Sequence, residues 1–156
     1  MSIIYRFYCE KCGHEEDIYF GSGKFWYRKN YPQMVSAAIN GEFGAEIQNI
    51  FRIHPNAAVY YSKVLTKCKN CGKHENILSL SVYLPKDEGF VNENKFVNFL
   101  NIDKCYNRVA KFEPKCKFCG GDVEIFTEDN FDVEEITLNC PNCQSLMTGD
   151  FGGVWD

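Results

Sequence analysis

The sequence lacks a long apolar run, and only three of its 156 residues are histidine. Its apolar stretches, such as residues 57–61, are far shorter than the roughly 20 residues that a membrane-spanning helix needs. The first residues reach a charged stretch and a cysteine pair before the apolar core of a signal peptide could form. We therefore expect no membrane-spanning segment and a cytoplasmic location.

Recognisable catalytic patterns are absent as well. No serine, histidine and aspartate arrangement can be identified, and residues 21–24 lack the length and pattern of a phosphate-binding loop. Two of the histidines, His14 and His74, each follow a complete cysteine pair, so we expect them on the surface of a hairpin. His54, before Pro55, is expected at a helix end. The sequence thus predicts a protein that is not an enzyme.

Cysteine is abundant, and its spacing is regular. Eight of the nine cysteines form pairs with two intervening residues, a spacing that a disulfide framework rarely repeats. Such a gap lets both sulfurs of a tight turn bind one ion at about 2.3 Å. Four pairs therefore predict two zinc ions in Cys₄ sites and a reducing compartment. The pairs are Cys9/Cys12, Cys68/Cys71, Cys116/Cys119 and Cys140/Cys143.

Glycine follows three of the four pairs, at Gly13, Gly72 and Gly120. The backbone that leaves such a turn, which we call a knuckle, tends to need a positive φ, which glycine adopts without strain. This feature favours metal binding over disulfides. The remaining cysteine, Cys105, shares its segment with Val109 and Phe112 and is expected to be a small buried apolar residue.

The pairing of the knuckles is less direct. Sequential pairing places the first two pairs on one ion, with 55 residues between them, and the last two on another, with 20 residues between them. An interval of 20 residues is close to that of a zinc ribbon, which favours this pairing. The longer interval is then explained by an insertion. Such an insertion is tolerated because the free-energy cost of closing a loop grows only slowly with its length. A crossed arrangement, in which the second and third pairs share an ion, stays open.

Short runs of β-branched and aromatic residues flank every knuckle and predict β-hairpins. Between the first two knuckles, we expect a helix that begins at Pro32 and ends near Asn40, and another over residues 45–52. The fold class is therefore α+β, with two small zinc-ribbon β-hairpin modules, the first carrying a helical-hairpin insertion. The expected domains are residues 1–85 with the insertion at about 21–56, a connection at 86–100, and residues 101–156 with an acidic C-terminal part.

The segment Cys9–Glu16, read as CEKCGHEE and preceded by IYRFY, resembles the opening of FmdB-type zinc ribbons. The four knuckles more broadly resemble zinc-ribbon and rubredoxin-type folds, and the layout is similar to uncharacterised bacterial zinc-ribbon proteins. The close similarity covers about twenty residues and ends where those short proteins have their second knuckle. The resemblance implies bound metal and a ribbon fold.

Iron is the alternative metal, because four thiolates bind either ion. Only the fourth pair, Cys140-Pro141-Asn142-Cys143, has the proline typical of rubredoxin loops, and it lacks the following glycine. An iron-binding, rubredoxin-like electron carrier is therefore an alternative function.

Charge is unevenly distributed along the chain. Residues 1–120 contain 17 basic and 12 acidic groups, whereas residues 121–156 contain nine acidic groups and no basic one. Basic side chains near the second and third knuckles are candidate contacts to nucleic acid or to a protein partner. They are Lys63, Lys67, Lys69, Lys73, Lys104, Arg108, Lys111, Lys115 and Lys117.

The acidic total opposes nucleic-acid binding, and the acidic C-terminal part suits a basic protein surface. We therefore expect a non-catalytic binding or adaptor module with a protein partner, and a nucleic-acid-binding zinc ribbon as the alternative. The chain closes on the aromatic segment 151–155. We expect this tail to dock on the body of the protein.

Overall fold

The computed structural model describes residues 2–87, 89 and 102–156, which form two units. The expected connection at 86–100 lies mostly outside the described residues. Each unit draws on both of the expected domains, so the units are not consecutive stretches of the chain. The first unit is Met1–Gly23, Ser62–Leu78 and Pro114–Asp156; the second is Lys24–Tyr61 and Ser79–Glu113.

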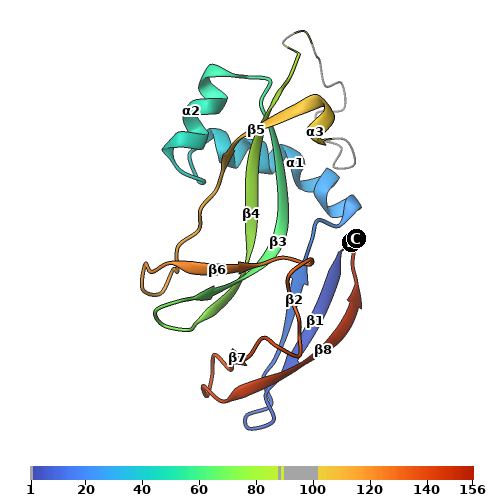
Figure 1. Ribbon diagram of the computed structural model, residues 1–156, viewed down its shortest axis with the longest axis vertical. Coiled ribbons are helices and arrows are strands. Elements are labelled where there is room, and N and C mark those ends of the chain that lie inside the picture. Colours follow the sequence, from blue (N-terminus) through green and yellow to red (C-terminus); the bar gives the residue numbers. More distant parts are fainter. Residues whose placement is uncertain (1, 88, 90–101) are drawn as a thin grey trace. The chain divides into compact units, whose positions relative to one another are not determined.

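One four-stranded sheet belongs to the first unit, in the order β2-β1-β8-β7 (Figure 1). Strand β1 pairs antiparallel with β2 on one side and with β8 on the other, so the two ends of the chain meet in one sheet. Strand β7 pairs with the first two residues of β8. The strands are β1 (Ile3–Tyr8), β2 (Glu15–Phe20), β7 (Leu138–Asn139) and β8 (Leu146–Val154).

A second four-stranded sheet has the order β5-β4-β3-β6. Its long central strands, β3 and β4, contribute residues to both units. Strand β6 pairs antiparallel with the end of β3, and β5 with the end of β4. The strands are β3 (Ala58–Cys68), β4 (His74–Pro85), β5 (Tyr106–Lys111) and β6 (Val123–Phe126). The mostly stranded, mixed architecture is consistent with the expected α+β class.

Aromatic rings fill the core of the first unit. Phe131, in the loop between β6 and β7, packs with ring centroids 4.9 Å from Tyr5 and 4.7 Å from Phe20. Buried Leu65 and Leu138 join the same cluster. Cys9 and Cys140 are fully buried within it, so the core extends directly to one group of cysteines.

Helices α1 (Lys24–Ile39) and α2 (Ala45–Ile53) lie between β2 and β3 in sequence, and a short α3 (Ile102–Cys105) precedes β5. The second helix agrees closely with the expected 45–52. The expected start of the first helix at Pro32 is wrong, because α1 begins eight residues earlier and Pro32 lies inside it. Among the residues that the structure describes, no helix combines the length and apolar composition needed to cross a bilayer.

The early start of α1 has a tertiary cause. The Tyr27 hydroxyl donates to the Val59 carbonyl at 2.8 Å, and the Val59 amide donates to the Tyr31 hydroxyl at 3.3 Å. Both tyrosines precede Pro32 and are buried. These bonds to β3 hold the turn before the proline in the helix, which the local sequence signals did not reveal.

The C-terminal tail docks as expected. The Trp155 indole N–H donates to the Phe20 carbonyl at 2.9 Å, and its ring lies edge-on to Tyr19 at 5.6 Å. The Trp155 amide also bonds to the Ser2 carbonyl. The tail therefore extends the pairing of the two chain ends beyond β8.

We expect Phe131→Ala to destabilise the protein by about 3 kcal/mol, because it removes a buried ring and leaves a cavity. The matched variant Phe151→Ala, at a ring that is 60% exposed, should change stability by no more than about 1 kcal/mol. Chemical denaturation of the metal-loaded protein measures both. Equal losses in the two variants would contradict this account of the core.

Candidate metal centres

The eight paired cysteines form two clusters of four. Cys9, Cys12, Cys140 and Cys143 make the first cluster; Cys68, Cys71, Cys116 and Cys119 make the second. All sulfurs of a cluster lie within 4.8 Å of one another. Four sulfur pairs, each joining two different knuckles, are 3.4–3.6 Å apart. A disulfide requires about 2.0 Å, whereas four sulfurs at about 2.3 Å from a tetrahedral ion lie roughly 3.8 Å apart. The geometry therefore fits a metal ion and not disulfides.

The sequential pairing is wrong, and the crossed arrangement is the one that forms. The first and fourth knuckles share a cluster, and the second and third knuckles are nested inside that pairing. Strand pairing is the physical reason. Strand β1 runs into Cys9, and β8 follows the fourth knuckle, with Tyr8 opposite Thr148. In the same way Cys68, at the end of β3, lies opposite Val123 at the start of β6.

The nested pairing also cuts across the expected domains, because each cluster combines cysteines from residues 1–85 with cysteines from residues 101–156. The first and second knuckles belong to different clusters, so α1 and α2, which lie between them, do not separate two halves of one ribbon. All eight cysteines belong to the first unit. The second unit, which contains both longer helices, contributes no residue to either cluster.

The four knuckles share one backbone pattern. The amide of each first cysteine donates to the carbonyl five residues later, at 2.8–3.0 Å. The amide four residues after that cysteine donates back to its carbonyl, again at 2.8–3.0 Å. The residue that makes this return bond has a φ between 63° and 76° in every knuckle. Those residues are Gly13, Gly72, Gly120 and Gln144.

Three knuckles use glycine at this position, as the sequence indicated, but the fourth uses glutamine. Gln144 is the one non-glycine residue with positive φ in the part of the chain that the structure describes. A side chain in this left-handed conformation costs about 1–2 kcal/mol relative to glycine. The fourth knuckle thus has the common backbone in spite of its sequence.

Backbone amides stabilise thiolates in both clusters. The amide of Cys71, followed in importance by that of Asn70, donates to the Cys68 sulfur and lowers the pKa of that thiol to about 6. The amide of Ser145 lowers the pKa of Cys143 to about 6 in the other cluster. Metal ligation needs thiolates, so these donors favour the charged form that an ion binds.

Sequence reasoning missed a histidine and carboxylate group beside the knuckles. The side chain of His74 is only 5% exposed, which overturns the expectation that it lies on the surface. Its Nε2 lies 2.9 Å from Glu16 Oε2, and this hydrogen bond lowers the pKa of Glu16. His14 is also partly buried and faces the same carboxylate at 3.8 Å. Glu16 therefore links the first and second knuckles.

The candidate basic residues do not all gather in one unit. Lys104, Arg108 and Lys111 lie in the second unit, and the others lie in the first. Two of the latter are engaged with carboxylates: Lys115 with Asp122, and Lys117 with Glu75 at 2.6 Å. Lys67 donates to the carbonyl of Thr137 at 2.8 Å, and Lys63, Lys69 and Lys73 complete the set.

Cys105 belongs to neither cluster. It ends α3 and is exposed, so the expectation that it is a buried apolar residue is wrong.

Comparisons with known proteins find no family model that matches the chain, and no curated protein or solved structure with significant similarity to it. The clusters are compatible with zinc-ribbon knuckles, but no match supports one particular ribbon family.

The nested pairing predicts the metal content of double variants. Cys9→Ser/Cys140→Ser should lose one ion per chain, because both changes affect one site, whereas Cys9→Ser/Cys68→Ser should lose two. Elemental analysis of the purified proteins measures this difference. Cys105→Ser, outside the clusters, is the control and should keep both ions. Sequential pairing requires the reverse result for the two double variants.

Proposed function

We propose that the protein is a non-catalytic, zinc-stabilised binding module that contacts a macromolecular partner, with a protein favoured over a nucleic acid. The observation that carries the proposal is the pair of Cys₄ clusters. Four thiolates complete a tetrahedral shell, whereas a catalytic zinc keeps a position open for water or substrate. Ions held in this way stabilise the fold, and binding to a partner is then a property of the surface residues.

The two clusters explain how the first unit is stabilised. A structural zinc site supplies roughly 10 kcal/mol or more of folding free energy. That contribution is large against the 5–15 kcal/mol of net stability that is usual for a domain. The tight turns and backbone donors of all four knuckles suit a structural role. Zinc is preferred to iron because only the fourth knuckle carries the rubredoxin-like proline, and that knuckle lacks the following glycine.

Charge supports a protein partner. The formal net charge is −4, and each Cys₄ zinc site adds two further negative charges. Exposed Asp132, Glu134 and Glu135 lie in the loop that packs against β8 through Val133 and Gly149. A polyanion would be repelled by this surface, whereas a protein can meet it locally with basic side chains.

Metal content and colour test the first half of the proposal. We expect two zinc ions per chain in a colourless sample. Chelation should unfold the first unit, because the thiolates of each cluster then lose the ion that they share. Elemental analysis, visible absorption and circular dichroism measure these results. Iron with charge-transfer bands would contradict the proposal and favour the electron-carrier alternative.

Partner binding tests the second half. A partner would be captured by crosslinking to the zinc-loaded chain, then purified and titrated back in the presence of nuclease. We expect binding that depends on zinc and weakens only modestly with salt. A single-stranded oligonucleotide serves as the comparison, because nucleic-acid affinity falls steeply with salt, with a slope of about −0.7 per neutralised phosphate. Tighter binding of the oligonucleotide, with such a slope, would favour the nucleic-acid alternative.

A further inference from the structure

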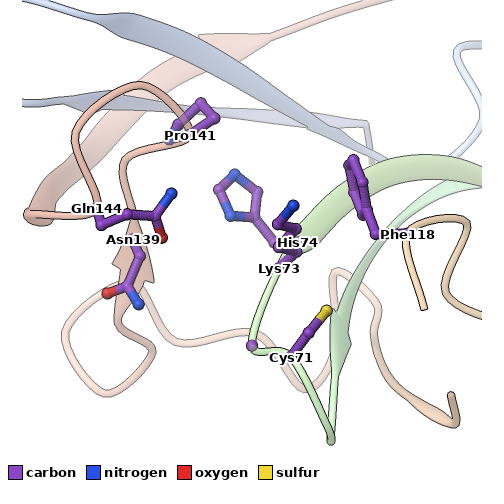
Figure 2. Close-up of a pocket in the computed structure, with 8 residues that line it drawn as sticks. Cys71, Lys73, His74, Phe118, Asn139, Pro141 and Gln144 are labelled. Carbon is purple, nitrogen blue, oxygen red and sulfur yellow. The ribbon is translucent and has the colours of Figure 1, made fainter.

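A small pocket lies among three of the four knuckles of the first unit. Its cavity of about 120 Å³ is lined by residues of three knuckles. They are Cys71, Gly72, Lys73 and His74 at the second, Phe118 of the third, and Asn139, Pro141 and Gln144 around the fourth. Figure 2 shows the residues of the fourth knuckle on one side and Lys73, His74 and Phe118 on the other. The pocket therefore depends on both cysteine clusters being formed.

The backbone of Gln144 gives the first indication that the pocket binds something. Its φ of 63° is the value at which the other three knuckles use glycine. A side chain retained in a strained conformation is a recognised mark of a functional position. The backbone amide of Gln144 donates to the Cys140 carbonyl, but in the described part of the chain its side-chain amide has no hydrogen-bond partner. The fold itself therefore does not use the side-chain amide. The exposed side-chain amide is therefore available to an outside ligand.

Charge gives the second indication. Lys73 is the one lysine or arginine that lines the pocket, and no aspartate or glutamate lines it; besides His74, the one other group that can carry charge there is Cys71, whose sulfur belongs to a metal cluster. The Lys73 ammonium lies 4.4 Å from the centre of the Phe118 ring and has no carboxylate partner among the described residues. An anion in the pocket would give this ammonium group a partner of opposite charge.

His74 forms a firm wall of the pocket. Its buried ring is held in place by the 2.9 Å bond from Nε2 to Glu16 Oε2. Glu16 itself does not line the pocket, so its charge is engaged by the histidine ring and not presented to the cavity. The pocket thus combines a fixed ring, the Lys73 ammonium group and two exposed side-chain amides, those of Asn139 and Gln144.

Size decides the class of ligand. The cavity measures about 120 Å³. Small-molecule and cofactor sites usually measure about 300–1,000 Å³, so a whole nucleotide or cofactor is too large. A single side chain fits. Protein partners commonly anchor themselves by one side chain in such a pocket.

We propose that this pocket receives the carboxylate of an aspartate or glutamate side chain from the protein partner. The carboxylate pairs with the Lys73 ammonium and accepts from the Gln144 or Asn139 amide, while Phe118 and Pro141 cover its aliphatic stem. This inference rests on the proposed function, because it names the contact by which a protein binds the module.

The test uses the zinc-loaded full chain and two peptides. One is an acetylated and amidated decapeptide of alternating glycine, serine and glutamate; the other has glutamine in place of each glutamate. We expect saturable NMR shifts of the Gln144 and Asn139 side-chain amides with the first peptide. Binding of the second should be about tenfold weaker or more, because it lacks the charge-assisted bond. Equal binding of the two peptides would overturn the proposal.

Variants separate the pocket from general electrostatic attraction. Lys73→Gln and Gln144→Gly should each weaken binding of the glutamate peptide severalfold, with both zinc ions retained. Lys69→Gln is the matched control, since Lys69 is an exposed lysine of the same knuckle that does not line the pocket. An equal loss in Lys69→Gln and Lys73→Gln would refute a specific site, as would saturable binding of oligothymidine in the pocket that is tighter than that of the glutamate peptide.

The stability of Gln144→Gly separates a binding role of the side chain from a structural one. Relief of the positive φ should leave the denaturation midpoint unchanged or higher. A lower midpoint would show that the fold needs the side chain and would remove the argument. If a purified protein partner binds Lys73→Gln and Gln144→Gly as well as the parent, the pocket proposal fails while the proposed function stands. If no protein binds the parent chain, the proposed function fails, and the pocket proposal fails with it.

Discussion

The sharing of one cysteine cluster by the first and last knuckles constrains the rest of the first unit. Cys12 and Cys140 are 128 residues apart in sequence, yet their sulfurs are 3.5 Å apart. Strands β1 and β8 leave this cluster side by side, and Trp155 continues their association to the tail. The second cluster closes inside the first, across β3 and β6. The metal centres and the strand pairing therefore describe one arrangement.

Local features of this arrangement could be predicted from the sequence, but the pairing of knuckles could not. The knuckles, the flanking strands and the need for positive φ at Gly13, Gly72 and Gly120 depend on residues close in the chain. Either pairing binds the same number of ions, so metal affinity does not decide between them. Loop closure favours sequential pairing by only about 1–2 kcal/mol. The core around Phe131 and the β1–β8 pairing contribute more stabilising free energy than that difference. Both depend on contacts between segments distant in sequence.

The same distinction explains the errors over single residues. Pro32 is a good first residue for a helix, but tyrosine bonds to β3 hold an earlier start. A histidine after a knuckle usually faces water, but His74 is buried because Glu16, from another hairpin, binds it. In each case a partner distant in sequence overrides a sound local preference. The candidate pocket was invisible for this reason, since three separate knuckles line it.

The four knuckles have the same backbone, so their differences must come from side chains. Lys73, after the second knuckle, lies over the exposed Phe118 of the third, while the first is linked through Glu16 to His74. The fourth departs most, because it places a glutamine where the shared geometry favours glycine. A metal knuckle needs only its cysteines and its turn. The residues that the metal does not require are therefore the ones available for recognition, and Gln144 is the one that the turn itself opposes.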